Sequence, residues 1–190
     1  NQAYADAYLD QMKTIQHAET KVAVNQLPLT QAVATQLFRL MAYKDEYEVA
    51  RLYTNGPFAQ QLEDTFSGDY RLEFHLAPPL LAFRKDAQGR PKKITFGPWM
   101  LPVFKQLAKF KFLRATPLDL FGYHPDRKLE RRLLQDYQQK LPSIASQLTS
   151  ANYPTAIAWA KAPDQVRGFG PVKAAAVQEV ENSLFRSSEK

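Results

Sequence analysis

Residues 70–76 read YRLEFHL, and in this stretch apolar and polar side chains alternate. The apolar set is Tyr70, Leu72, Phe74 and Leu76. A period of two is typical of a β-strand with one buried face, whereas an amphipathic helix repeats every three to four residues. On both sides of this stretch the apolar residues return to the helical spacing. The sequence therefore predicts a small sheet inserted in a mainly helical chain.

The sheet is expected to contain three antiparallel strands. Pro78-Pro79 ends the first strand because proline cannot donate to a strand ladder. Residues 80–84 and 92–96 then flank the turn sequence DAQG at 86–89, which is typical of a hairpin. The fold class is therefore α+β, mainly α: a helical domain with one small antiparallel sheet or hairpin at about 70–96.

Helical spacing accounts for the rest of the chain. It predicts helices over residues 4–24, 30–55, 57–66, 98–111 and 125–141, a new helix from Pro142, one from Asn152 through Trp159, and a last one over 171–185. Thr30 and Asn152 are expected to be N-caps, and Gly56 a left-handed C-terminal residue. Pro102 must then lie in the first turn of its helix.

The composition narrows the class of protein. The chain has 190 residues, of which 45% are hydrophobic and 23% charged, and these values suit one globular domain over 1–190. No apolar run reaches the roughly 18 residues of a membrane span. There is no cysteine, which excludes disulfides, thiolate zinc sites and cysteine-ligated clusters on this segment and suits a reducing, cytoplasmic location. The chain opens without Met on a helical stripe, so we interpret it as a piece of a longer protein.

Positive charge is concentrated in the second part of the chain. Residues 1–76 contain six basic and ten acidic residues, and residues 77–190 contain 19 basic and nine acidic ones, so the two parts carry charges of −4 and +10. A polarised molecule of this kind attracts phosphates or acidic proteins. The alternative is that lysine and arginine solvate the outer faces of helices, and both interpretations stay open.

Two groups of residues are candidates for binding an anion or a partner. The hairpin contributes Arg90, Lys92 and Lys93, and the charged helix expected over 125–141 contributes Arg127 and Arg131. The second group lies in VRGFGPVK at 166–173 and comprises Arg167, Gly168, Gly170 and Lys173, where a glycine turn precedes a helix start that suits phosphate. Residues 166–176 also resemble a helix-hairpin-helix nucleic-acid module. A simple capping turn is the favoured interpretation of this second group.

The charged stretch from Lys44 to Arg51 is interpreted as the exposed surface of a helix. Lys44 with Glu48 and Glu48 with Arg51 have the spacing of ion pairs on a helix surface. The alternative is a partly buried ion network flanked by tyrosines. His17, His75 and His124 have no helical metal-ligand spacing, and His75 is expected to be a hydrogen-bonding surface residue, so no metal site is predicted.

Several segments, in order, resemble one family of enzymes. They read LMAYKDEYEVARLYT from Leu40, FHLAPPLLA from Phe74, FGPWM from Phe96, LRATPLDLFGY from Leu113 and RGFGPVK from Arg167. These stretches resemble the C-terminal region of the long bacterial indolepyruvate ferredoxin oxidoreductases, in the 2-oxoacid:ferredoxin oxidoreductase family. The resemblance covers about residues 30–173. Ala115 and His124 depart from the family pattern, which has glycine and a hydroxyl residue there.

The resemblance implies a role inside a larger redox enzyme. Such an enzyme decarboxylates a 2-oxoacid oxidatively, using thiamine diphosphate with Mg, 4Fe-4S clusters, coenzyme A as acyl acceptor and ferredoxin as electron acceptor. This segment would then be a non-catalytic accessory domain with no cofactor of its own. Its implied partners are the catalytic domains of the same chain, ferredoxin and a second protomer, with no membrane and no nucleic acid. An inert spacer and a basic nucleic-acid-binding module are the alternatives.

Overall fold

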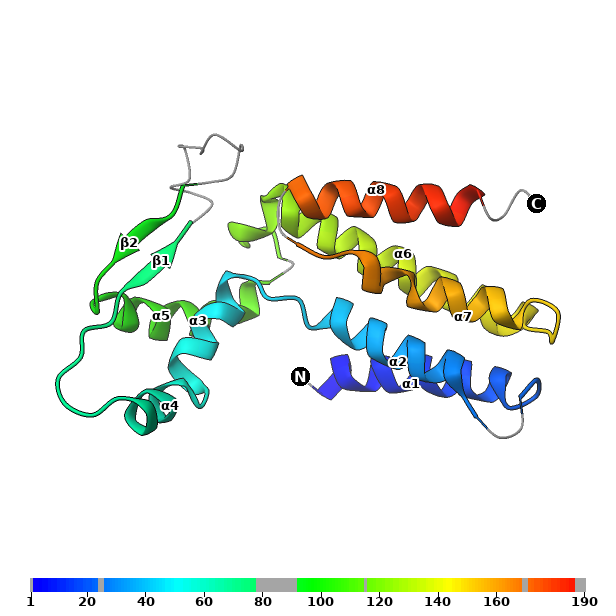
Figure 1. Cartoon of the computed structure of the whole chain (residues 1–190), viewed down its shortest axis with the longest axis horizontal. Helices are drawn as coiled ribbons and strands as arrows, with labels where there is room; N and C mark the ends of the chain where they lie inside the picture. Colours follow the sequence, from blue (N-terminus) through cyan, green and yellow to red (C-terminus); the bar gives the residue numbers. More distant parts are fainter. Residues whose placement is uncertain (1, 24–25, 78–91, 115, 169–170, 187–190) are drawn as a thin grey trace. The chain divides into compact units, whose positions relative to one another are not determined.

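The computed structural model of this chain describes residues 2–23, 26–77, 92–114, 116–168 and 171–186 (Figure 1). Within them lie eight α-helices and one two-stranded antiparallel sheet, which confirms the mainly α, α+β class. The helices are α1 Gln2–Glu19, α2 Pro28–Met41, α3 Glu46–Asn55, α4 Phe58–Thr65, α5 Met100–Lys109, α6 Pro125–Gln147, α7 Tyr153–Lys161 and α8 Pro171–Arg186. Three 3₁₀ turns are η1 Phe110–Leu113, η2 Phe121–Tyr123 and η3 Ala162–Gln165.

The chain groups into two units. Unit 1 contains Asn1–Tyr43 and Leu129–Lys190, and unit 2 contains Lys44–Lys128. From the sequence, residues 1–190 were predicted to form a single domain. None of the described helices is long and apolar enough to cross a membrane.

The core of unit 1 lies among α1, α2, α6 and α7, which run side by side in Figure 1. Leu29, Val33 and Leu37 on α2 are fully buried at the three-to-four spacing that an amphipathic helix requires. On the facing helices the Tyr137 ring stacks on Trp159, with 4.7 Å between ring centroids. The Tyr137 hydroxyl also donates to the Ala160 carbonyl, so this buried polar group is satisfied.

A smaller apolar cluster holds α8 in unit 1. Val177 and Val180 on α8 pack with Ala162 and Val166, which lie in and just after η3. Leu129 and Leu133 of α6 cover this cluster. The last helix is therefore anchored by its middle turns.

Unit 2 is built around an aromatic cluster. Tyr53 of α3 stacks on Phe104 of α5, with 5.3 Å between centroids, and the edges of both rings contact Phe74. Phe74 belongs to strand β1 (Phe74–Leu76), which pairs with β2 (Ile94–Phe96) in antiparallel register, Phe74 opposite Phe96. Phe74 is buried and the neighbouring His75 is exposed, as the alternation predicted.

The sheet differs from the prediction in its length. Residues 70–73 precede β1 instead of belonging to it, and Tyr70 is half exposed, because β2 pairs with only three residues. The third predicted strand, 80–84, lies outside the described residues. The segment 92–96 was expected to pair with 80–84, whereas in the described part of the chain its last three residues pair with β1.

The prediction of one helix from Thr30 to Asn55 was wrong. The helix ends at Met41, and Asp45 starts a separate helix by capping α3. Thr30 is not the cap of α2, which begins at Pro28 with Leu27 in the N-cap position, because the Glu19 carboxylate accepts from the first amides instead. Gly56 has φ −102° and is extended, so its expected left-handed conformation was also wrong.

Two further helix boundaries differ from expectation. Pro142 lies inside α6 instead of starting a new helix, because Tyr137 and Leu141 bury the helix face there and this packing outweighs the local cost of proline. Asn152 occupies the N-cap position of α7 as predicted, but its side chain accepts from the Thr149 amide and caps nothing in the helix. The helix predicted over 57–66, the position of Pro102 in the first turn of α5 and the helix from Pro171 are confirmed.

Candidate functional site

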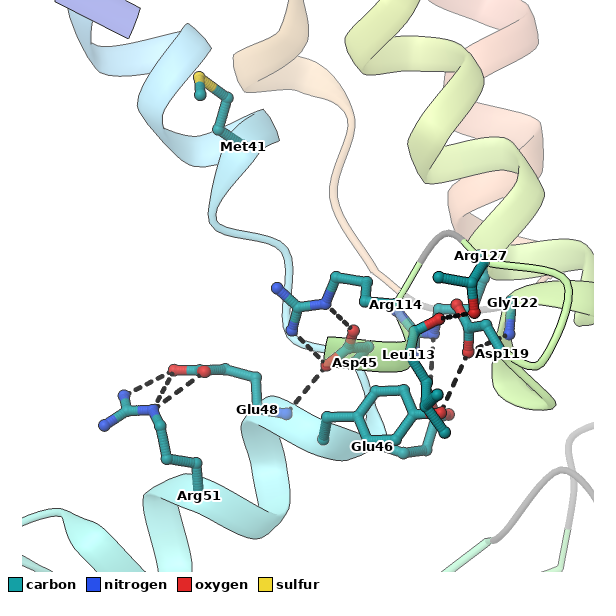
Figure 2. A network of polar contacts seen from close by, with 12 residues as sticks. Met41, Asp45, Glu46, Glu48, Arg51, Leu113, Arg114, Asp119, Gly122 and Arg127 are labelled. Atoms are coloured by element: carbon teal, nitrogen blue, oxygen red, sulfur yellow. Dashed lines mark hydrogen bonds and ion pairs between the residues drawn. The ribbon is translucent and has the colours of Figure 1, made fainter. Parts of the chain in front are cut away.

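A network of polar side chains surrounds the start of α3 in unit 2 (Figure 2). Asp45 is extended, and its carboxylate accepts from the Glu48 amide at 2.9 Å, which makes it the N-cap. The same buried carboxylate accepts two hydrogen bonds from Arg114, from Nε at 2.5 Å and from Nη2 at 2.7 Å. This bidentate pair joins α3 to the end of η1, 69 residues further along the chain.

A second carboxylate extends the network. The Tyr47 hydroxyl donates to Asp119 Oδ1 at 3.3 Å, and the Gly122 amide donates to the same oxygen at 3.0 Å. Burial, together with the Asp119 charge, raises the pKa of Tyr47 to about 12. Tyr47 therefore remains protonated at neutral pH and keeps its role as donor. Its ring also contacts Phe121 edge to face, with 5.2 Å between centroids.

Glu46 and Arg127 form the third link of this network. Arg127 Nε lies 3.4 Å from Glu46 Oε2, and both side chains are largely buried. Burial raises the pKa of the Glu46 carboxyl, and the neighbouring Arg127 charge opposes this effect. We call these six residues, Asp45, Glu46, Tyr47, Arg114, Asp119 and Arg127, the α3 network.

The interactions of the α3 network are structural, because they hold separate segments of the chain together. Each of its carboxylates has a cationic or hydrogen-bonding partner within the network. Such mutual pairing fixes the positions of the groups. The network therefore ties Arg114, Asp119 and Arg127 to the first turn of α3.

The sequence analysis found only part of this arrangement. Glu48 and Arg51 form the predicted surface pair at 2.6 Å, and the hydrogen bond from Arg51 lowers the pKa of Glu48. Lys44 lies before α3, so helical spacing does not apply to its predicted pair with Glu48. Asp45 and Glu46 belong to the buried network that was the less favoured alternative. The missed signal was Asp45 three residues before Glu48, which is the spacing of a capping box.

The predicted glycine turn at 166–173 lies in unit 1. Gly168 has φ +95°, a left-handed conformation that suits glycine, while Gly170 lies outside the described residues. Arg167 pairs with Asp164 at 3.1 Å, and the Lys173 ammonium donates to Glu130 at 2.8 Å. The charges that were expected to attract an anion are thus offset by carboxylates of the same unit.

A small cavity adjoins Lys173. It measures about 60 Å³ and is lined by Arg39, Leu40, Tyr43, Glu130, Leu133, Pro163, Val166 and Lys173. Arg39 is itself engaged, since it donates to Asp164 and to the Val166 carbonyl at 3.0 Å each. A water molecule occupies about 30 Å³, so a cavity of this size admits only a very small ligand.

The remaining basic candidates fall in different parts of the chain. Lys92 and Lys93 are exposed just before β2, while Arg90 lies outside the described residues. Arg127 belongs to the α3 network, and Arg131 is half-buried on α6. Of the residues predicted to bind an anion, only Arg167, Gly168 and Lys173 are seen around one turn.

The remaining features of the described residues are the histidines and a larger groove. His75 Nδ1 lies 3.0 Å from the Thr95 hydroxyl on the neighbouring strand, as expected of a hydrogen-bonding surface residue. No three histidine, aspartate or glutamate side chains of the described residues gather as metal ligands. An open groove of about 640 Å³ between α6 and α7 is lined by residues that include Ile144, Leu148 and Trp159.

Comparisons with known proteins give one match. A comparison with curated proteins and one with solved structures found no similar protein. A family model described as a family of unknown function, DUF6537, matches residues 1–185, which include both units. The match spans nearly the whole chain, and the protein belongs to the DUF6537 family.

Proposed function

We propose that this chain is a non-catalytic accessory domain of a 2-oxoacid:ferredoxin oxidoreductase of the indolepyruvate type, with a role in assembly. The support comes from what the residues that carry the resemblance do in the fold. One resembling stretch supplies Asp45 and Tyr47, and another supplies Arg114 and Asp119. In the α3 network each residue of the first stretch bonds to one of the second: Asp45 to Arg114, and Tyr47 to Asp119.

Two other resembling stretches also contact each other in the fold. One begins with Phe74 and another with Phe96, and these residues lie opposite each other in the sheet. The pattern that resembles the enzyme family is therefore a pattern of fold-building residues. The observation that carries the proposal is the bidentate Asp45–Arg114 pair. It engages one charged residue from each of two resembling stretches in a contact inside the chain.

The donor set of the chain also favours an accessory role. Iron–sulfur clusters need several thiolates, and the chain contains no cysteine, so the clusters would be held by another part of the enzyme. What this chain would contribute is a folded surface against which the catalytic domains pack.

Removing the segment from the whole enzyme tests the proposal. We expect the shortened enzyme to lose its normal oligomeric mass and most of its arylpyruvate oxidation with coenzyme A and ferredoxin. Mass photometry and a ferredoxin reduction assay measure the two quantities. A shortened enzyme with the mass and turnover of the whole one would refute the assembly role, and a whole polypeptide without thiamine diphosphate and cluster motifs would refute the parent.

The basic part of the chain is tested separately. In Lys92→Glu/Lys93→Glu of the whole enzyme, we expect the KM for ferredoxin or for coenzyme A to rise at low salt, because these exposed cations would face an anionic partner. Arg127 is unsuitable for this test because it pairs with Glu46. Lys140→Glu/Lys161→Glu, which changes two exposed lysines of unit 1, is the matched control. Unchanged KM values would exclude this face as the anion-binding surface.

A further inference from the structure

Five large apolar side chains are exposed within residues 110–123 of unit 2. Their exposed fractions are 71% for Phe112, 68% for Leu118, 66% for Leu120, 59% for Tyr123 and 47% for Phe110. Single exposed apolar residues are normal on any protein, whereas a concentration of them marks an interaction surface. We call these five residues the apolar surface.

The chain that carries the apolar surface is held in place by successive turns. The amides of Thr116, Asp119 and Gly122 donate to the carbonyls three residues before each of them, at 3.0 to 3.1 Å. The Tyr123 hydroxyl donates to the Pro117 carbonyl at 2.9 Å. Exposure of these side chains therefore does not arise from a loose loop. A surface that is already ordered loses little conformational entropy when it binds.

The α3 network fixes the same segment to the body of unit 2. Asp119 is buried and accepts from Tyr47, whereas its two neighbours Leu118 and Leu120 are about two-thirds exposed. Arg114 holds the start of the segment through Asp45. A buried aspartate between two exposed leucines orients both leucines outward. Apolar side chains that are held facing outward in this way are suited to contact a partner.

Charge indicates which partner this surface fits. Lys105, Lys109, Lys111 and Lys128 are exposed within residues 98–128, where the only carboxylates are those of Asp119, which is buried, and Asp126. Of these lysines, Lys111 also interacts electrostatically with Glu48 of α3. A second copy of the chain that docks through the same surface would bring like charges together, which opposes binding. An apolar protein surface bordered by acidic residues is complementary to it.

We infer that the apolar surface docks onto an acidic, apolar-centred face of the enzyme's catalytic part; this inference rests on the proposed function and names the surface through which the accessory domain assembles. The partner's apolar side chains would cover Leu118 and Leu120. Its carboxylates would lie near the exposed lysines. The contact would weaken as salt rises, because exposed charges are screened.

Binding of this chain to the separately produced catalytic part, measured by isothermal titration calorimetry, tests the inference. We expect Leu118→Ser/Leu120→Ser to weaken binding at least tenfold, and Lys109→Glu/Lys111→Glu to weaken it at low salt. Phe38→Ser is the matched control, because Phe38 is equally exposed but lies in unit 1. Circular dichroism checks that each variant is folded. Should the serine variant not fold, the lysine variants, which keep the apolar side chains, decide the question.

The outcomes distinguish a failure of the proposed function from a failure of the proposed docking surface. If the wild-type chain does not bind the catalytic part, the proposed function fails. If it binds and neither variant pair changes the affinity, the proposed function stands and the docking surface is wrong. Cosedimentation with phosphatidylcholine–phosphatidylglycerol vesicles that is lost in the serine variant would make a lipid surface the occupant. If the wild-type chain forms a dimer and the serine variant does not, the occupant of the apolar surface would be a second copy of the chain. Either result overturns the inference.

Discussion

The Tyr153 hydroxyl donates a 2.5 Å hydrogen bond to the Glu19 carboxylate, although 134 residues separate the two in the sequence. Glu19 is completely buried at the end of α1. Its two oxygens also accept from the amides of Leu29 and Thr30, at 2.7 Å each. One carboxylate therefore caps α2 from outside and joins α1, α2 and α7. The helix dipole favours a negative charge at this position, and three donors offset the cost of burying it.

Replacing Glu19 is expected to destabilise unit 1 strongly. Glu19→Gln removes the charge and replaces one of the two accepting oxygens by an NH2 group, which cannot accept from a backbone amide. We expect the free energy of unfolding to fall by about 2–3 kcal/mol, since hydrogen bonds to a charged group contribute roughly 1.5–3 kcal/mol each. Urea denaturation followed by the fluorescence of Trp159, in a Trp99→Phe background, measures the loss.

Glu179→Gln provides the control for this prediction. Glu179 is exposed on α8, and exposed substitutions of this kind change stability by less than about 0.5 kcal/mol. Equal stabilities of the two glutamine variants would show that Glu19 does not cap α2 in solution.

Stability is expected to fall at alkaline pH through Tyr153. Burial, then the hydrogen bond to Glu19 and its charge, raise the pKa of Tyr153 from 10 to about 12. Because the folded pKa lies above the unfolded one, this contribution is complete below pH 10 and is lost as the pH rises to about 12. The stability difference between the wild type and Tyr153→Phe should therefore be constant from pH 7 to 9.5 and shrink above pH 10. Denaturation at a series of pH values measures it, and a difference that grows above pH 10 contradicts the assignment.

The Asp45–Arg114 pair predicts a graded series of stabilities. Asp45→Ala removes the cap of α3 and leaves Arg114 without its carboxylate, so we expect a loss of about 3 kcal/mol. Asp45→Asn can still cap the helix and should lose less, about 1–2 kcal/mol. Both values come from chemical denaturation.

Glu48→Gln tests whether this loss is specific to the buried pair. Glu48 also pairs with an arginine, but that pair lies on the helix surface at i,i+3, where such contacts contribute about 0.5 kcal/mol. A Glu48→Gln variant as unstable as Asp45→Ala would mean that surface charge and not the buried joint stabilises α3.

Local patterns in the sequence predicted most of the helices and the strand at Phe74, but not all of their boundaries. The alternation at 70–76 placed Phe74 in the core of unit 2, and the three-to-four spacing of Val33 and Leu37 placed α2 in the core of unit 1. Errors arose where a distant side chain decides a boundary. Glu19 moves the start of α2 from Thr30 to Pro28, and no local rule contains that information.

The candidate site depended even more on distant contacts. The basic residues were selected for their charge, but charge alone does not show which carboxylate will lie opposite. Lys173 lies against Glu130 and Arg127 against Glu46, across 43 and 81 positions of sequence. Of the α3 network, only the capping role of Asp45 had a local signal. The exposure of Leu118 and Leu120 could not be predicted either, because apolar residues are expected in the core.

Two glycines of the described residues are left-handed, and they allow a last prediction in which one serves as the control for the other. Gly168 and Gly68 have φ values of +95° and +87°, so alanine at either position costs about 1 kcal/mol for the backbone conformation. A Cβ at Gly168 would also lie 2.9 Å from Val172 Cγ1 and 3.2 Å from Val172 Cβ, whereas nothing lies within 4 Å of a Cβ at Gly68. We therefore expect Gly168→Ala to destabilise by about 2 kcal/mol and Gly68→Ala by about half as much, measured by urea denaturation. Hydrogen exchange should show faster opening of the first turns of α8 only in Gly168→Ala. Equal effects of the two substitutions would mean that Val172 yields without cost and that the turn does not depend on close packing.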